Sequence, residues 1–204
     1  MKKYFIAFEP DERLEKSILL QKESVLNAVG NQKYLSHPPH FTVIVFTSDE
    51  EEELCKIFLD EASKIKKFKI NISGLHIFYD DVLTGGNSVV YNLDDKDIKF
   101  LKNLQNNLVQ AIDSVNSKEL FLNEKEKFDK LSKIERENVL KWGFPYVGDI
   151  WMPHITIASI NKTKFEEAIK IIRNNEFSGP FFIDSICLYN FGDEMKLVKR
   201  IKLK

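Results

Sequence analysis

Two segments far apart in the chain each carry a histidine and a threonine separated by one residue: Pro39-His40-Phe41-Thr42-Val43 and Pro153-His154-Ile155-Thr156-Ile157. Both segments are apolar and rich in β-branched residues, which is typical of a β-strand, and a strand turns residues i and i+2 to the same face. Two imidazoles, one accepting a proton while the other donates one, suit in-line displacement at a phosphodiester, and two hydroxyls can hold its non-bridging oxygens. We therefore predict that His40 and His154 form an acid–base pair and that Thr42 and Thr156 bind phosphate.

The repetition of this motif is hard to attribute to chance. The chain has four His and five Thr among 204 residues, so a threonine two positions after a given histidine is uncommon, and two such cases are rarer still. A lone histidine in a strand is more often structural, and a lone threonine can be present because it favours strands. A proline precedes both histidines, and since proline has no N–H donor, we expect each strand to begin at or beside its histidine.

Four further residues are candidates for binding substrate. The segment that leads into the second motif is aromatic, so Phe144, Tyr146 and Trp151 could cover the site and stack on a base. Equally, these rings could anchor the preceding segment to the core. His37 lies three residues before His40, outside the strand, where it could touch a ligand or belong to the surface.

The residue types offer no support for a metal or a cofactor. The two histidines lie in separate strands, without the i, i+4 spacing or the neighbouring carboxylates expected of a zinc or two-metal hydrolase. Cys55 and Cys187 lie in unrelated apolar settings with no Cys-x-x-Cys spacing, which predicts free buried thiols. We expect catalysis that is independent of metal and needs no cofactor.

The hydrophobic pattern predicts the same series of elements twice. The expected elements are strand 4–8, helix 11–29, strand 40–46, helix 49–65, strands 68–79 and 88–93, helix 95–115, a second motif strand, helix 163–174, and strands 181–191 and 196–203. We infer an internal duplication, with one repeat over 4–79 and the other over 88–203, interrupted by a charged insertion at 118–149 that we expect to be a solvated helix. A pseudo-two-fold axis would bring His40 and His154 face to face across a central cleft.

Composition limits the class of protein. With 204 residues, 43% of them hydrophobic, the whole chain 1–204 can fold as a single domain of two packed lobes. The formal net charge of −1 gives no basic face for a long duplex, so a small nucleotide or short RNA is the better partner. No stretch reaches the length of a membrane span, and we expect a cytoplasmic protein, without a membrane contact, that is a monomer.

Paired His-x-Thr motifs within a duplicated α/β plan resemble the 2H phosphoesterase superfamily, which includes the bacterial RNA 2',3'-cyclic phosphodiesterases also called 2'-5' RNA ligases. The resemblance covers most of the chain outside the insertion. It implies an α+β fold of two pseudo-symmetric lobes, each an antiparallel sheet with flanking helices, and a central cleft that holds both motifs without metal. Carried over, His40 and His154 are the acid–base pair, and Thr42 and Thr156 hold the phosphate.

One departure from the family bears on the substrate. Many RNA-directed members have a basic residue shortly after the second motif, where this chain has Ser159, and Lys162 could replace that charge only if its loop returns to the site. The substrate could therefore be a 2',3'-cyclic phosphate, or a 2'-5' linked or cyclic oligonucleotide. From a different class, a non-catalytic module that binds a nucleotide or an RNA end could use the same cleft.

Overall fold

The computed structural model describes residues 1–120, 125–192 and 195–204, and the helices and strands follow the expected order closely. The strands are β1 (Lys2–Pro10), β2 (Phe41–Ser48), β3 (Phe68–Phe78), β4 (Asn87–Leu93), β5 (Ile155–Ile160), β6 (Gly179–Phe191) and β7 (Met195–Lys202). The α-helices are α1 (Glu12–Val29), α2 (Glu51–Ser63), α3 (Asp95–Ala111), α4 (Lys125–Lys130), α5 (Lys133–Trp142) and α6 (Phe165–Asn174). Two 3-10 turns, η1 (Gly148–Ile150) and η2 (Lys162–Lys164), precede β5 and α6.

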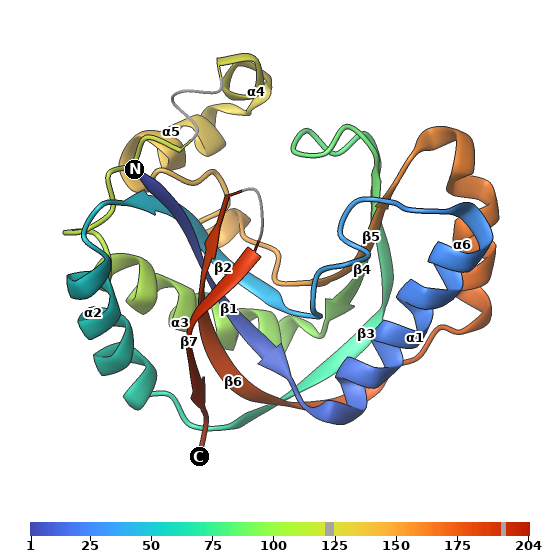
Figure 1. The fold of residues 1–204 in the computed structure, drawn as a ribbon, viewed down its shortest axis with the longest axis horizontal. Coiled ribbons are helices and arrows are strands. Elements are labelled where there is room, and N and C mark those ends of the chain that lie inside the picture. The colour runs from blue at the N-terminus through green and yellow to red at the C-terminus, as the bar shows by residue number, and fades with distance from the viewer. Residues whose placement is uncertain (121–124, 193–194) are drawn as a thin grey trace.

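The described strands form one antiparallel sheet in the order β1-β2-β5-β4-β3-β6-β7, with a further pairing between β1 and β6 (Figure 1). Strand β6 makes this closure possible because it is long. Its first part pairs with β3, where Phe68 lies opposite Ile183, and its second part pairs with β1, where Tyr4 lies opposite Asn190. The two separate sheets expected from the resemblance are thus joined, at β3–β6 and at β2–β5.

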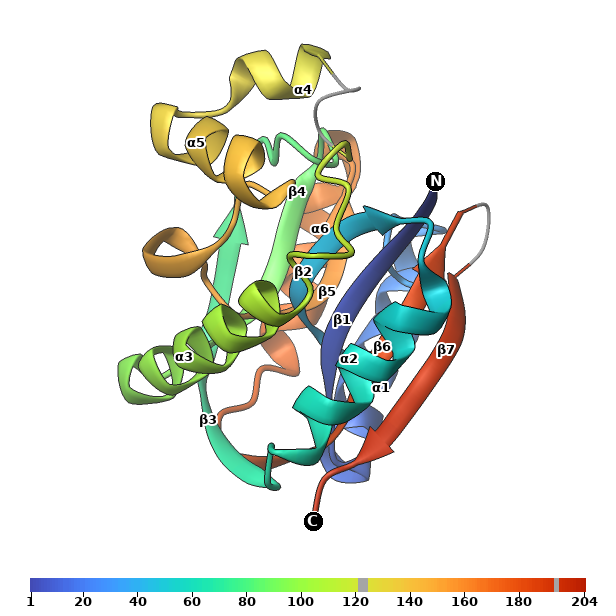
Figure 2. The same cartoon turned by 90° about the vertical axis from the view of Figure 1, so that its left-hand side faces the viewer.

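The helices cover this sheet in two pairs, each with one helix from either half of the sequence. Helix α1 packs beside α6, and α2 packs beside α3, as Figures 1 and 2 show from two sides. Helix α1 begins after Asp11, whose side chain accepts a hydrogen bond from the Leu14 amide, and it ends at Gly30, which has a positive φ of 77°. Its buried face includes Ile18 and Val25, which recur at helical spacing.

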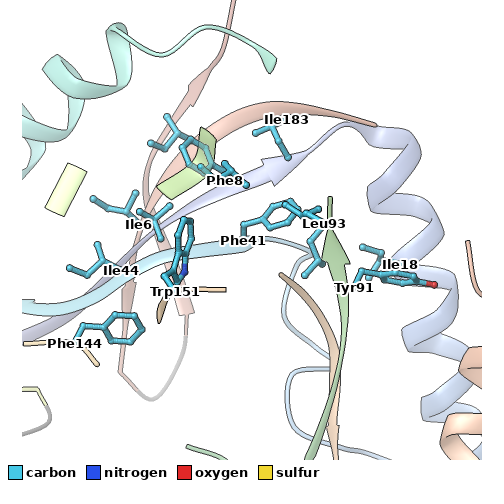
Figure 3. Packing of buried hydrophobic residues seen from close by; sticks show 14 of the residues in the cluster. Ile6, Phe8, Ile18, Phe41, Ile44, Tyr91, Leu93, Phe144, Trp151 and Ile183 are labelled. Carbon is cyan, nitrogen blue, oxygen red and sulfur yellow. The ribbon is translucent and has the colours of Figure 1, made fainter. Parts of the chain in front are cut away.

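The main core lies between the sheet and the helices. Ile6, Phe41 and Ile44 from β1 and β2 are fully buried there, and Figure 3 shows them beside the indole of Trp151. Since Phe41, the first residue of β2, points into this core, His40 before it and Thr42 after it are expected to point to the opposite face. The core therefore fixes the direction of the motif side chains.

The insertion differs from the single helix that its charge pattern predicts. It contains two short helices, α4 and α5, which stand clear of the sheet in both views (Figures 1 and 2). The break comes at Leu131, which is buried, and at Ser132, which caps α5 in a capping box with Glu135. Residues 121–124 of the insertion lie outside the described residues. No helix in the described parts of the chain is both long and apolar enough to cross a bilayer.

Candidate active site

The pairing of β2 with β5 brings the two motifs together. Phe41 lies opposite Ile155 in this antiparallel pair, and both side chains are fully buried. Residues that flank a partnered pair oppose each other, so His40 lies beside Thr156 and Thr42 beside His154, all on the face away from the core. In a regular antiparallel pair, diagonal neighbours such as His40 and His154 are roughly 7–8 Å apart at the backbone, a spacing that would admit one phosphoryl group.

Each motif strand has an irregularity directly after its threonine. In the pairing of β2 with β1, Ile6 lies opposite Ile44 but Ala7 lies opposite Thr42, so Val43 is an extra residue. In the pairing of β5 with β4, Val89 lies opposite Ala158 and Val90 opposite Thr156, which makes Ile157 the extra one. A β-bulge bends its strand and changes where nearby side chains point, and bulges are frequent beside active sites.

Both histidine rings are held by the same kind of hydrogen bond. Nδ1 of His40 lies 2.7 Å from the carbonyl oxygen of Pro38, and Nδ1 of His154 lies 2.7 Å from that of Met152. A carbonyl only accepts, so Nδ1–H is the donor in each ring, and Nε2 is the nitrogen left for a substrate. Both rings therefore present equivalent nitrogens, each able to exchange a proton.

Burial lowers the pKa of both histidines, and different charges act on the two. For His40 the pKa falls to about 4, because burial and the Lys22 ammonium outweigh the hydrogen bond to Pro38 and the Glu9 carboxylate. For His154 burial again lowers the pKa, while the hydrogen bond to Met152 and the Asp81 carboxylate oppose it. Both imidazoles are thus neutral at pH 7, with a cation close to the first and an anion close to the second.

Aromatic rings from outside the motifs support both imidazoles. Phe5 of β1 packs against His40 with ring centroids 5.3 Å apart, and Phe78 of β3 packs against His154 at 5.2 Å. Phe5 is itself stacked on Tyr189, and Phe78 makes an edge contact with His76. The histidines thus lie on an ordered aromatic floor, in which His76 is a packing residue.

Comparison with known proteins gives the family and the fold of the chain. The family model described as the 2'-5' RNA ligase superfamily matches residues 10–194. The chain belongs to this superfamily. It is similar in fold to TT0787 of Thermus thermophilus, with a TM-score of 0.58 at 13% identity over 98% of this chain and 97% of that one. Escherichia coli LigT complexed with NADP+ gives a TM-score of 0.51 at 14% identity over 100% and 98%. No curated protein matches the chain.

Two of the three aromatic candidates before the second motif of this superfamily member are core residues. Phe144 is 5% exposed and Trp151 4% exposed, and both belong to the main hydrophobic cluster (Figure 3). This burial favours the anchoring role over stacking on a base. Tyr146 is half-buried, and burial together with the charges of Glu135 and Asp81 raises its pKa to about 12. Only Tyr146 among the three remains a substrate-binding candidate.

His37 lies closer to the site than a surface residue would. Its ring is half-buried and makes an edge contact with Tyr34, with centroids 5.2 Å apart. Both residues line a cavity of about 600 Å³. Burial, followed by the charge of Lys22, lowers the pKa of His37, so its ring is neutral at pH 7. We retain His37 as a substrate-binding candidate.

Lys162, the candidate to replace the basic residue that many superfamily members have after the second motif, is engaged in an ion pair. The Lys162 ammonium forms an exposed ion pair with Asp80. Ser159 is buried, and its hydroxyl donates to Thr84 Oγ1 at 2.7 Å. Among the described residues, no group of three or more His, Cys, Asp or Glu side chains is placed to hold a metal ion.

Two buried polar residues that the sequence pattern did not single out position the first motif. Gln105 of α3 donates to the carbonyls of Val43 and Tyr146, at 2.8 and 2.9 Å, and accepts from the Gly148 amide. It thus ties the bulge of β2 to the segment before the second motif. Lys22 of α1 donates to two carbonyls of the loop that leads into the first motif. Both residues lie in helices, where a polar residue is normally expected to face solvent, so no local pattern reveals them.

A buried carboxylate lies behind His40. Glu9 accepts hydrogen bonds from the Tyr189 hydroxyl, from Ser185 at 3.1 Å and from Arg200 at 3.0 Å. Burial raises the pKa of Glu9, but the hydrogen bonds from Tyr189 and Arg200 outweigh it and lower the pKa overall. Glu9 therefore remains ionised and is fully partnered, which suits a structural anchor behind the site rather than a proton donor.

Proposed function

We propose that this protein is a metal-independent phosphodiesterase that acts on RNA or nucleotides through general acid–base catalysis by His40 and His154. The observation that carries this proposal is the pairing of Phe41 with Ile155, because that register sets both His-x-Thr motifs on one face of adjacent strands. Membership of the superfamily supports phosphodiester chemistry on RNA or nucleotides in general. The bond that is cleaved is a 2',3'-cyclic phosphate or a linkage in a 2'-5' linked or cyclic oligonucleotide.

The two halves of the site support an origin by internal duplication. Each has a proline, a histidine bonded to a carbonyl two residues upstream, a threonine and a bulge, in the same order. Strands of one half nevertheless pair with strands of the other. β1 of the first half pairs with β6 of the second, and β3 of the first half pairs with β4 of the second. The duplicated units are therefore interleaved around a pseudo-two-fold axis between β2 and β5.

The charges around the two histidines assign their roles. We assign His40 as the base, since the nearby Lys22 ammonium and burial both favour its neutral form. We assign His154 as the acid, since the Asp81 carboxylate favours its protonated form and a bound phosphate would favour it further. In the reaction, Nε2 of His40 takes a proton from water or a ribose hydroxyl while that oxygen attacks phosphorus. Nε2 of His154 then protonates the departing oxygen.

The threonines complete the arrangement. Thr42 and Thr156 are half-buried and share the face of the histidines, so their hydroxyls can donate to the non-bridging oxygens on either side of the phosphoryl group. Charge on those oxygens grows toward the transition state, and a fixed hydroxyl stabilises it. We expect Thr42→Ala and Thr156→Ala to lower kcat more than they raise KM, whereas Thr→Ser at either position restores most of the activity.

The test is turnover in the presence of EDTA on a panel of nucleoside 2',3'-cyclic phosphates, 2'-5' and 3'-5' dinucleotides and cyclic dinucleotides. Wild type is compared with His40→Ala and His154→Ala, and a thermal melt of each variant shows that it is folded. We expect turnover of at least one substrate, reduced by roughly 10²- to 10⁴-fold in either variant. Binding of these nucleotides without turnover of any would contradict the proposal and favour a nucleotide-binding or RNA-end-binding module.

A further inference from the structure

A cavity of about 600 Å³ lies between the loop before β2, the turn before β4 and the end of β5. Its size falls within the range of about 300–1,000 Å³ that is usual for small-molecule sites. The lining side chains that could contact a ligand include Lys33, Tyr34, His37, Thr84, Ser159 and Asn161. No Asp or Glu is among the lining residues in the described part of the chain, so the cavity suits a polar ligand that carries negative charge.

Hydrogen bonds join the three segments that line the cavity. Lys33 Nζ donates to the carbonyl of Thr84 at 2.7 Å, and the Ser159 amide donates to the carbonyl of Lys33 at 3.0 Å. Gly86 allows the turn to approach β5, because a Cβ at this position would lie 2.8 Å from the carbonyl oxygen of Ile160. These contacts hold all three segments together, so the cavity has a fixed shape before any ligand arrives.

The loop on one side of the cavity holds an unfavourable backbone conformation. Tyr34 has a φ of +70°, which is rare for a bulky residue. Lys22, which is 3% exposed, stabilises this conformation by donating to the carbonyls of Tyr34 and His37, each at 2.7 Å. Such strain persists only where the surroundings enforce it, and it is concentrated at functional sites. In this loop the strained backbone places Tyr34 in the lining of the cavity, where a base can stack against its ring.

The cavity is connected to both halves of the catalytic site. His37 lies three residues before His40, whose ring is held by the intervening Pro38. On the other side, Ser159 of the cavity lining lies in β5, three residues after Thr156 of the second motif. A nucleotide chain with its reacting phosphate at the histidines can therefore extend into the cavity.

We propose that this cavity binds the nucleotide next to the reacting phosphodiester, which makes an oligonucleotide of two or more residues the substrate class. This inference rests on the proposed function of the histidine pair. Lys33 contacts the phosphate of the second nucleotide, for which two of its three ammonium donors remain beyond the bond to Thr84. Tyr34 stacks on the base, and the neutral His37 ring lies between the two nucleotides.

Two substrates with the same reacting group test this proposal: adenosine 2',3'-cyclic phosphate and the diadenylate that ends in a 2',3'-cyclic phosphate. We expect wild type to prefer the diadenylate in kcat/KM. Lys33→Met should raise KM for the diadenylate by roughly tenfold or more, the range of a hydrogen bond to a charged group, and much less for the mononucleotide. Lys162→Met, which removes an exposed lysine near the same end of β5, should change neither value.

A second variant with its own control separates loss of the cavity from loss of the fold. Ser36→Trp fills the cavity from its exposed rim and should remove the preference for the diadenylate, whereas Ser63→Trp, on the surface of α2, should leave it intact. Equal KM values for the two substrates in wild type, or an equal effect of Lys33→Met on both, would overturn the proposal. If wild type turns over neither substrate, a 2',3'-cyclic phosphate is not the reacting group, and the panel described above decides the proposed function. Calorimetric binding of 5'-phosphorylated diadenylate then decides the cavity alone: weaker binding by Lys33→Met supports it, and unchanged binding overturns it.

Discussion

Backbone carbonyl groups hold the side chains of His40 and His154 in place. A carbonyl two residues upstream accepts a hydrogen bond from Nδ1–H of each ring, which leaves Nε2 available to a substrate in both. The sequence alone makes the two motifs equivalent, and only the structure shows how they differ. The difference comes from charges in other elements: Lys22 and, more weakly, Glu9 act on His40, whereas Asp81 acts on His154.

This asymmetry predicts an acidic optimum for kcat/KM. Activity needs His40 neutral, so it rises as pH rises through a pKa of about 4. Activity also needs His154 protonated, so it falls as pH rises through a pKa that lies below the ordinary value of 6.5. The maximum should therefore lie between about pH 4 and 6.5, measured as kcat/KM across pH in a buffer of constant ionic strength. A flat profile, or an optimum above pH 7.5, would argue against the assigned roles.

Asp81→Asn tests the charge beside His154. Loss of the carboxylate should lower the pKa of His154 further, which moves the descending limb of the kcat/KM profile to lower pH and reduces activity at pH 7. The matched control is Asp80→Asn, which removes the neighbouring carboxylate that pairs with Lys162 at the surface. If both variants gave the same profile as wild type, Asp81 would have no part in setting the protonation of His154.

At the scale of elements, local patterns were sufficient to find the strands and helices but not their partners. Helix α1 and strand β3 end within one residue of their expected bounds, because apolar periodicity and turn residues are local signals. Strand β6 pairs with both β1 and β3 because it is long. No local pattern in the sequence records how far this strand continues. The break between α4 and α5 did have a signal, since Ser132 and Glu135 have the spacing of a capping box.

Gln105 is the polar link that the helical pattern of α3 conceals. Gln105→Ala would leave the carbonyls of Val43 and Tyr146 and the Gly148 amide without their partner. A buried group left unpaired costs about 1–3 kcal/mol, so we expect a loss of roughly 2–5 kcal/mol in the free energy of unfolding, measured by urea denaturation. Gln110→Ala, at an exposed position of the same helix, should change stability by less than about 0.5 kcal/mol. Equal effects of the two variants would show that the link is not structural.

At the scale of the whole molecule, the two halves of the sequence hold one another in place. The sheet closes only because strands of one half pair with strands of the other, so the two motifs come together as the fold forms. The repeat of the motifs predicted their meeting, since two-fold related strands can pair at their axis. The 600 Å³ cavity had no sequence signal, because it depends on the positive φ of Tyr34 and the buried Lys22.

The neutral state of the half-buried His40 makes the stability of the fold depend on pH. In the unfolded chain this imidazole binds a proton below about pH 6.5, whereas in the folded protein it does so only below about pH 4. Acidification between these values therefore favours unfolding. Relative to His40→Asn, wild type should lose up to about 3 kcal/mol of unfolding free energy between pH 7 and pH 4, measured by urea denaturation. Parallel stability curves for the two proteins would show that His40 is not buried in its neutral form.

The most direct test of the acid–base pair is a double-mutant comparison of kcat/KM among wild type, His40→Ala, His154→Ala and the double variant. Two residues that act in one transition state are not additive. We expect each single variant to lose roughly 10²- to 10⁴-fold, and the double variant to lie within about tenfold of the weaker single variant. Losses that multiply in the double variant, or full activity in either single variant, would contradict a catalytic pair formed where β2 meets β5.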